Sequence, residues 1–188
     1  MLTLIEQAAG GMERLIESLL SYAQVGQGSL KSQQVHLDEI VESVKVTLAS
    51  VIKETGGQII CTRLPVLEGD PILLKQLFQN LAGNALRYHR PGQAPVVEIS
   101  AEQLGAAWQF SVKDNGQGIP LEYQDYVFEP LKRLHGSDIP GTGLGLTLCR
   151  TITARHGGRI WVESEGVGCG AIFRVSLPAA QIAKESVT

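Results

Sequence analysis

Residues 108–120 read WQFSVKDNGQGIP, a stretch in which an apolar run leads directly into Asp114, Gly116 and Gly118. The run predicts a strand at 108–113, which places Asp114 at a strand end beside backbone that carries no side chain at either glycine. Such a carboxylate can accept a hydrogen bond from an exocyclic amine, for example N6 of adenine, while a flat base lies against the main chain. An ordinary Asn-Gly turn contains the same triplet, so this stretch alone leaves both interpretations open.

A second glycine-rich stretch, GTGLGL at residues 141–146, comes immediately before a helix that we expect at 144–156. Alternating glycines before a helix N-terminus expose backbone amides and the positive end of the helix dipole, and this arrangement suits an anion. A flexible hinge is the alternative interpretation. Eleven of the 21 glycines lie between Gly116 and Gly170, which indicates a site built from loops in the second half of the chain.

The clearest helix start in the chain is Asp70 as N-cap with Pro71 at the first helical position, and this helix is expected to end at Tyr88. A polar stripe with spacing i, i+4, i+8 and i+11 runs along one side and consists of Gln76, Asn80, Asn84 and Arg87. Asparagine competes with the helix for backbone hydrogen bonds, so two on one face indicate a function. An amide oxygen suits Mg²⁺ and an arginine suits phosphate; a solvated helix face is the alternative.

The remaining pattern alternates helices with strand pairs. We expect a helix at 38–54 capped by Asp38, and strands at 59–63, 96–103, 159–165 and 171–177. Helices between mostly antiparallel strand pairs predict an α/β (α+β) two-layer sandwich, with helices covering one face of a mixed sheet. A doubly wound nucleotide fold is disfavoured, because the sequence has no GxGxxG after a first strand and no GxxxxGK[ST].

Three parts are expected along the chain: a helix and linker at 1–32, a compact domain at 33–180 and a frayed tail at 181–188. Residues 1–25 have an apolar seam of roughly heptad spacing. A seam of this kind on a lone helix needs a partner, which is either the domain or another chain.

Composition narrows the class of protein. Of the 188 residues 44% are apolar and the formal net charge is −3, so one domain with a core is expected and no nucleic acid partner. The sequence has no apolar run of membrane-spanning length, so we expect a cytoplasmic chain without a membrane segment, although a parent protein could have one upstream. Cys61, Cys149 and Cys169 are odd in number and far apart, which favours buried, reduced thiols over disulfides or a metal site.

Four motifs in one order give a far more specific signal than any one of them. They are NLAGNALRY at 80–88, DNGQGIP at 114–120, VFEPLKRLH at 127–135 and GTGLGL at 141–146. Together they resemble the N, G1, F and G2 boxes of the histidine-kinase branch of the ATPases that share a split nucleotide fold with gyrase and the HSP90 chaperones. The resemblance covers roughly residues 36–178 and implies a Bergerat-type sandwich. The lid and closing helix are similar to those of phytochrome-linked kinases.

The resemblance implies an ATP site that uses Mg²⁺. Asp114 would hold adenine N6, Asn84 would coordinate the metal ion with help from Asn80, and Arg133 would stabilise charge near the γ-phosphate. Asn84 and Arg133 are thus the implied catalytic residues, and 129–142 would form a mobile lid. The residues implied to bind ATP are Asn80, Asn84, Arg87, Tyr88, Asp114, Gly116, Gly118, Ile119, Lys132, Gly141, Thr142, Gly143, Leu144 and Gly145.

The sequence departs from the family pattern at several positions. Leu131 stands where an aromatic residue is usual, which would change the packing of the lid. Ala171 and Ile172 replace frequent threonines, which puts a polar contact near the base in doubt. Arg87 replaces a more usual lysine and keeps the charge.

The family's phosphoacceptor is a histidine on the first helix of a helical hairpin, and none of the four histidines here fits that pattern. They are His36, His89, His135 and His156, each better explained by local structure; His156, for example, ends a helix where a cation suits the dipole. Residues 1–25 instead resemble the second hairpin helix. We therefore expect a fragment that binds Mg·ATP without autophosphorylation, from a homodimeric parent that passes the phosphoryl group to a response regulator receiver domain.

Two alternatives remain. One is another enzyme of the same fold, either a serine kinase or a gyrase-like ATPase. The stretch from Gln76 to Asn84 contains no acidic residue that could activate water, which disfavours hydrolysis. The other is a catalytically silent regulatory module that acts by pairing through residues 1–25.

Overall fold

The computed structural model describes residues 10, 12, 15–16, 19–20, 22–23, 25, 29–132, 134 and 141–179. The described residues among 10–25 have helical backbone, in line with the expected N-terminal helix. The rest of that helix, the tail expected at 181–188, Arg133 and His135 lie outside the described residues. Among the described residues no helix combines the length and the apolarity needed to cross a bilayer.

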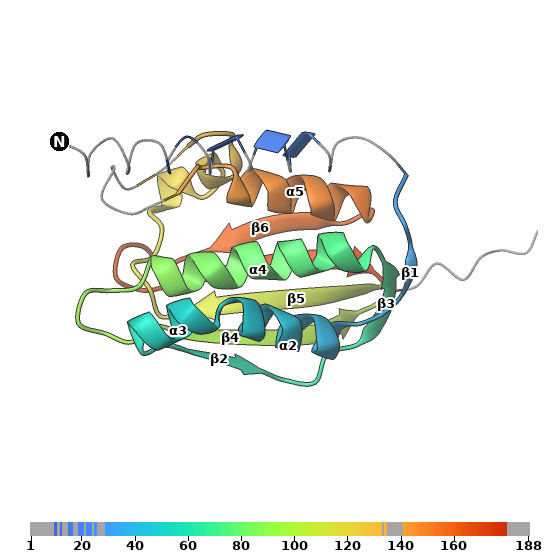
Figure 1. Cartoon of the computed structure of the whole chain (residues 1–188), viewed down its shortest axis with the longest axis horizontal. Coiled ribbons are helices and arrows are strands. Elements are labelled where there is room, and N and C mark those ends of the chain that lie inside the picture. Colours follow the sequence, from blue (N-terminus) through green and yellow to red (C-terminus); the bar gives the residue numbers. More distant parts are fainter. Residues whose placement is uncertain are drawn as a thin grey trace, which may run out of the picture.

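A five-stranded sheet forms one layer of the molecule (Figure 1). Its strands in spatial order are β2 (Gln58–Cys61), β4 (Val96–Leu104), β5 (Ala107–Asp114), β7 (Ala171–Pro178) and β6 (Arg159–Glu163). Only the β2–β4 pair is parallel, and the other neighbours are antiparallel. The sheet is therefore mixed and mostly antiparallel, as predicted.

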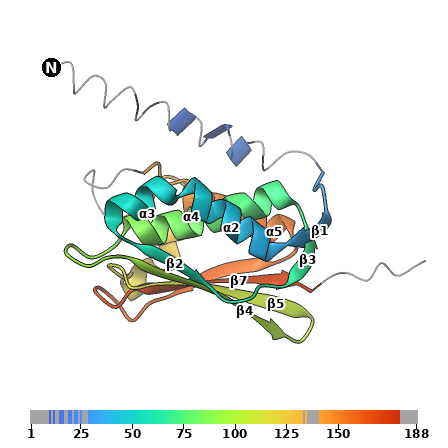
Figure 2. The same ribbon diagram turned by 60° about the horizontal axis from the view of Figure 1, so that its bottom comes forward.

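The second layer consists of helices that cover one face of this sheet (Figure 2). They are α2 (Leu37–Thr47), α3 (Ala49–Thr55), α4 (Pro71–Arg87) and α5 (Gly145–Arg155). Helix α4 packs on the centre of the sheet through fully buried leucines and through Phe78, whose ring meets that of Phe110 edge to face at 5.8 Å. The predicted two-layer sandwich is confirmed.

The start of α4 is fixed by the side chain predicted to cap it. Asp70 Oδ1 accepts hydrogen bonds from the N–H groups of Ile72 at 3.0 Å and Leu73 at 3.2 Å. Directly before this cap lies a two-stranded ribbon. In it β1 (Gln33–His36) pairs antiparallel with β3 (Val66–Gly69). The sequence did not reveal this ribbon, because four-residue strands are too short to show a period of two clearly.

The single helix predicted at 38–54 is wrong in two respects. It begins one residue earlier, with His36 as N-cap, and it breaks at Leu48 into α2 and α3. The hydroxyl of Thr47 donates to the carbonyl oxygen of Ser43, a back-bond that bends helices. Asp38 is not a cap, because its carboxylate accepts from the N–H of Leu64 at 2.8 Å and so ties α2 to the following loop.

The prediction of three buried thiols holds for one cysteine only. Cys149 on α5 is fully buried, and burial raises the pKa of its thiol far above the ordinary value. Cys61 is half-buried and Cys169 is exposed at the β6–β7 turn.

His156 ends α5, as the sequence indicates, and both of its ring nitrogens make hydrogen bonds with backbone. The N–H of Asp70 donates to Nε2 of His156 at 3.0 Å, so that nitrogen carries no proton. Nδ1 lies 2.8 Å from the carbonyl oxygen of Ile152 and donates to it. The imidazole thereby joins the end of α5 to the start of α4.

We expect His156→Ala to lower the free energy of unfolding by about 1–2 kcal/mol, because it leaves the N–H of Asp70 without its acceptor. Urea denaturation followed by circular dichroism measures this change. His36→Ala is the matched control, since His36 is exposed and its side chain makes no capping bond. Equal stability of the two variants would show that the bridge contributes nothing.

Candidate nucleotide-binding site

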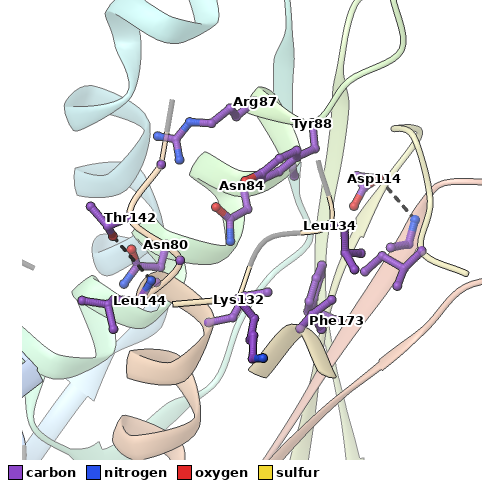
Figure 3. Close-up of a pocket in the computed structure, with 18 of the residues that line it drawn as sticks. Asn80, Asn84, Arg87, Tyr88, Asp114, Lys132, Leu134, Thr142, Leu144 and Phe173 are labelled. Carbon is purple, nitrogen blue, oxygen red and sulfur yellow. Dashed lines mark hydrogen bonds between the residues drawn. The ribbon is translucent and has the colours of Figure 1, made fainter. Parts of the chain in front are cut away.

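A cavity of about 430 Å³ opens between α4, the loop after β5 and the N-terminus of α5. Figure 3 shows Asn80, Asn84, Arg87 and Tyr88 along one wall, with Asp114 on the opposite side. Of the fourteen residues predicted to bind ATP, all except Gly116 line this cavity. The structure thus brings together predicted residues that are separated by up to 65 positions in the sequence, from Asn80 to Gly145.

Asp114 is positioned at one end of the cavity by two backbone N–H groups. Its Oδ1 accepts from Gly116 at 2.8 Å and from Ala171 at 3.2 Å. Burial raises the pKa of the Asp114 carboxyl above its ordinary value of 3.8, and the two backbone hydrogen bonds oppose that rise. Because Oδ1 is held on the protein side, Oδ2 is the oxygen left to accept from a ligand.

The glycines around Asp114 permit backbone to lie directly against backbone. A Cβ atom on Gly116 would lie 2.6 Å from the carbonyl oxygen of Tyr88, although Gly116 itself does not line the cavity. Gly118 has φ +73°, and a Cβ there would lie 2.0 Å from the carbonyl oxygen of Gly166. The glycines therefore build the wall, and Gly116 acts from behind it through its N–H.

The polar stripe of α4 faces the cavity as the sequence predicts, since Gln76, Asn80, Asn84 and Arg87 all line it. Within the described part of the chain, the side-chain amides of Asn80 and Asn84 make no hydrogen bond, and both residues are half-buried. Polar groups in such a position are available to a ligand. Their oxygens fit Mg²⁺, which prefers few protein oxygen ligands together with phosphate oxygens and water.

The stretch 141–145 forms the end of the cavity opposite Asp114 and leads into α5. The N–H of Leu144 donates to the hydroxyl of Thr142 at 3.4 Å. Gly143 has φ +73°, and a Cβ there would lie 2.8 Å from the backbone of Leu131. In contrast, Cβ atoms on Gly141 and Gly145 would meet nothing closer than 3.4 Å, so only the central glycine is required by packing.

Leu131, where the family usually has an aromatic residue, has an unusual backbone conformation. Leu131 has φ +61°, a left-handed conformation that is unfavourable for a leucine, and its side chain is 58% exposed. Its N–H donates to the carbonyl oxygen of Gly143 at 3.0 Å. The segment after η2 (Tyr126–Phe128) is thus anchored to the glycine stretch by backbone, while the leucine side chain stays outside the cavity.

Lys132 brings a positive charge to the rim. Its Nζ lies 4.6 Å from the centroid of the Tyr126 ring and 4.0 Å from a carboxylate oxygen of Glu129. A hydrogen bond to Tyr126 raises the pKa of the Lys132 ammonium, which therefore stays charged at neutral pH. Arg133, the other predicted cation, lies outside the described residues.

Several lining residues were not predicted, including Gln117, Tyr126, Leu134 and Phe173. Phe173 comes from β7 and meets Phe128 edge to face at 6.3 Å. The sequence placed Phe173 only in the strand expected at 171–177, and nothing in a strand pattern distinguishes a core position from a cavity floor. Ala171 lines the cavity through a methyl group, and its polar contribution is the backbone N–H that holds Asp114.

Binding of an amine by Asp114 is expected to weaken as pH falls. Only the ionised carboxylate offers an acceptor at Oδ2, and its pKa is raised, so the loss begins at a higher pH than for an ordinary aspartate. Calorimetric titration of ATP between pH 4 and pH 8, each point checked for folded protein, measures this dependence. A flat profile down to pH 4 would contradict a desolvated carboxylate in the site.

Comparison with known proteins agrees with this geometry. Residues 69–181 match the family described as histidine kinase-, DNA gyrase B- and HSP90-like ATPases. Among curated relatives, cyanobacterial phytochrome A of Nostoc sp. is 39% identical over 168 residues, which cover 89% of this chain and 22% of the relative. The adaptive-response sensory kinase SasA of Synechococcus elongatus is 32% identical over 173 residues, which cover 89% of this chain and 44% of the relative. The chain thus spans less than half the length of either.

Solved structures show the same fold. Full-length ShkA in complex with AMPPNP superimposes with a TM-score of 0.79 at 26% identity, over 95% of this chain and 38% of that one. The catalytic domain of histidine kinase ThkA superimposes with a TM-score of 0.67 at 28% identity, over 79% of this chain and 95% of that one. By family match, relatives and fold, this chain belongs to the histidine kinase-, DNA gyrase B- and HSP90-like ATPases, on the branch formed by the sensor histidine kinases of two-component systems.

Proposed function

We propose that this chain binds Mg·ATP and serves a parent sensor kinase by donating the γ-phosphate to a histidine on a helical hairpin. The observation that carries the proposal is the polarity of the cavity, with one half-buried carboxylate at one end and amides and glycine backbone at the other. The ATP-binding domain would comprise residues 33–180. Residues 1–32 would be the second hairpin helix and linker.

At the base end, Asp114 would select a 6-amino purine. Its Oδ1 is occupied by backbone donors, and Oδ2 faces the cavity as an acceptor. The apolar side chains of Ile119, Val127 and Phe173 line the same cavity and suit the faces of a flat base. A threonine in place of Ala171 could offer the base a polar side-chain contact, and that contact would be absent here. Recognition of the base would then rest on Asp114.

At the phosphate end, Asn84 would hold Mg²⁺ with Asn80 beside it, and the metal ion would neutralise charge on the phosphates. Arg87 and Lys132 would approach the same charge from the rim, and the N-terminus of α5 adds the positive end of a helix dipole. Gly143 and its neighbours would support the phosphate tail. Arg133 would stabilise charge that develops during transfer.

The acceptor histidine would come from outside this chain's domain. Both ring nitrogens of His156 bond to backbone, which leaves this histidine no free nitrogen as a nucleophile, and Nδ1 of His89 lies 2.8 Å from the carbonyl oxygen of Leu86. We further propose a homodimeric parent whose catalytic domain lies in the cytoplasm. A receiver domain would take the phosphoryl group; the related histidine kinase ThkA is known in complex with the response regulator TrrA.

Hydrolysis of ATP by water is less well supported. The residues of α4 that line the cavity are Gln76, Asn80, Asn84, Ala85 and Arg87. This set includes no carboxylate that could act as a general base, so a gyrase-like reaction has no candidate base on the helix.

Calorimetric titration of Mg·ATP into the chain tests the proposal, with Asn84→Ala as the informative variant. We expect saturable binding by the unmutated chain, and affinity at least about tenfold weaker for Asn84→Ala because a direct metal ligand is lost. Gln79→Ala on the same helix is the matched control, since Gln79 does not line the cavity. A folded chain that binds no ATP would instead favour the silent regulatory module.

Incubation with γ-labelled ATP tests the position of the acceptor. We expect no acid-labile phosphate on the chain itself, and label on a separately supplied hairpin from the parent kinase. Acid-labile label on this chain alone would place the acceptor among its own four histidines and refute that part of the proposal.

A further inference from the structure

Ser164 follows β6 and does not itself line the cavity, yet its polar groups reach three separate segments. Its hydroxyl accepts from the N–H of Ile119 at 2.9 Å and of Gly166 at 3.3 Å, and it donates to the carbonyl oxygen of Gly170 at 2.7 Å. Its carbonyl oxygen accepts from Nε2 of Gln124 at 2.8 Å. One half-buried serine therefore connects the loop after β5, the β6–β7 turn and the segment after η1 (Leu121–Tyr123).

Two of these contacts lead to the base end of the cavity. Ile119 lines the cavity and is buried, so its backbone position decides where the loop after Asp114 runs. Gly170 is followed by Ala171, whose N–H holds Oδ1 of Asp114. The Ser164 hydroxyl thus bonds both to the end of the loop that contains Asp114 and to the segment that orients its carboxylate.

Glycine backbone, and not packed side chains, fills the contact between these two segments. The N–H of Gly168 donates to the carbonyl oxygen of Gln117 at 2.6 Å, and that of Gly170 to Gly116 at 3.2 Å. A Cβ on Gly170 would lie 2.1 Å from the carbonyl oxygen of Asp114. Beside these backbone bonds, the hydroxyl of Ser164 adds side-chain hydrogen bonds across the contact, as the Asp114 carboxylate does through the N–H of Ala171.

The geometry points to Ser164 as a positioning residue of the nucleotide site, which acts through Ile119 and through the backbone of Gly170 and Ala171. It keeps the Asp114 carboxylate in the place where it distinguishes a 6-amino purine from a 6-oxo purine. This inference rests on the proposed ATP binding and deepens it, because it assigns the base selectivity to a hydroxyl outside the cavity wall.

Calorimetric titrations of Mg·ATP and Mg·ITP test the role, since ITP presents an oxygen where ATP presents the amine. The unmutated chain is expected to prefer ATP. Ser164→Ala should weaken ATP binding on the order of tenfold and leave ITP binding nearly unchanged, so the preference falls. Ser164→Thr keeps the hydroxyl and should restore the preference. Ser111→Ala is the control, because it removes a serine hydroxyl that accepts one hydrogen bond, from Arg174, and does not line the cavity.

If Ser164 contributes to stability alone, the measurements on Ser164→Ala will give a different result. Urea denaturation would then show lower stability of Ser164→Ala, while the ratio of ATP to ITP affinity in the folded protein would stay as in the unmutated chain, and the inference would be refuted. If Ser164→Ala does not fold, Ser164→Cys replaces it, with the same loss of preference expected. Absence of ATP binding by the folded, unmutated chain would refute the proposed function itself.

Discussion

Asp114→Asn is expected to abolish measurable ATP binding, with a loss of affinity of more than about a hundredfold. The backbone N–H groups of Gly116 and Ala171 require an oxygen at the Oδ1 position, so the amide of the variant must place its NH₂ group toward the cavity. That group is a donor and faces the donor amine of adenine, which replaces a charge-assisted hydrogen bond by a repulsive contact. Calorimetric titration of Mg·ATP measures the loss.

The same substitution should leave the fold intact, and this separates function from stability. The pKa of Asp114 is raised in the folded chain, so its carboxyl favours folding most when protonated, and that contribution is lost as pH rises through the raised pKa. A neutral amide removes this cost at neutral pH, and the free energy of unfolding should be unchanged or higher. Asp125→Asn is the charge-matched control, since Asp125 is exposed. Tight ATP binding by Asp114→Asn would disprove the assignment of Asp114 as the residue that binds the adenine base.

Gly118→Ala is expected to have the largest effect on stability, about 4 kcal/mol or more. The residue has φ +73°, where an L side chain is strained, and the new Cβ would lie 2.0 Å from the carbonyl oxygen of Gly166. Backbone on both sides of the contact must move, which separates the loop after Asp114 from the β6–β7 turn. Urea denaturation should show either a large fall in the midpoint or no cooperative transition.

Gly105→Ala provides a control with almost the same backbone angle. Gly105 has φ +61° in the β4–β5 turn, and a Cβ there would meet nothing within 4 Å. Gly105→Ala should lower the free energy of unfolding only by the cost of placing an alanine in the left-handed conformation, about 1–2 kcal/mol. If the two variants were equally stable, the close approach at Gly118 would not matter, and the account of the cavity wall would be wrong.

The site was predictable from sequence wherever its residues follow a local pattern. Asp70 and Pro71 mark a helix start that needs only its own first turn, so the register of α4 and the direction of its polar stripe followed directly. Asp114 with its glycines follows a strand and could likewise be placed at a strand end. The resemblance to histidine kinases added the roles of these residues, since four motifs agreed in their order.

Where tertiary contacts compete with local preference, the sequence was not sufficient. Asp38 has the properties of an N-cap but bonds to the N–H of Leu64, 26 positions away. His156 was expected to act only at the end of its own helix, and its Nε2 also accepts from the N–H of Asp70, 86 positions away. Each depends on a partner whose distance along the chain no local pattern encodes.

The sequence by itself determined the sandwich, the carboxylate at the strand end and the amide stripe, because hydrophobic period, capping and glycine placement act over a few residues. The tertiary structure alone decided that these features share one cavity. It also decided that Asp114 Oδ1 is occupied by the N–H of Ala171, and that Ser164 holds the two segments around it together. Those contacts form only when β5, β6 and β7 are paired, since the pairing brings residues 114–119 and 164–171 side by side.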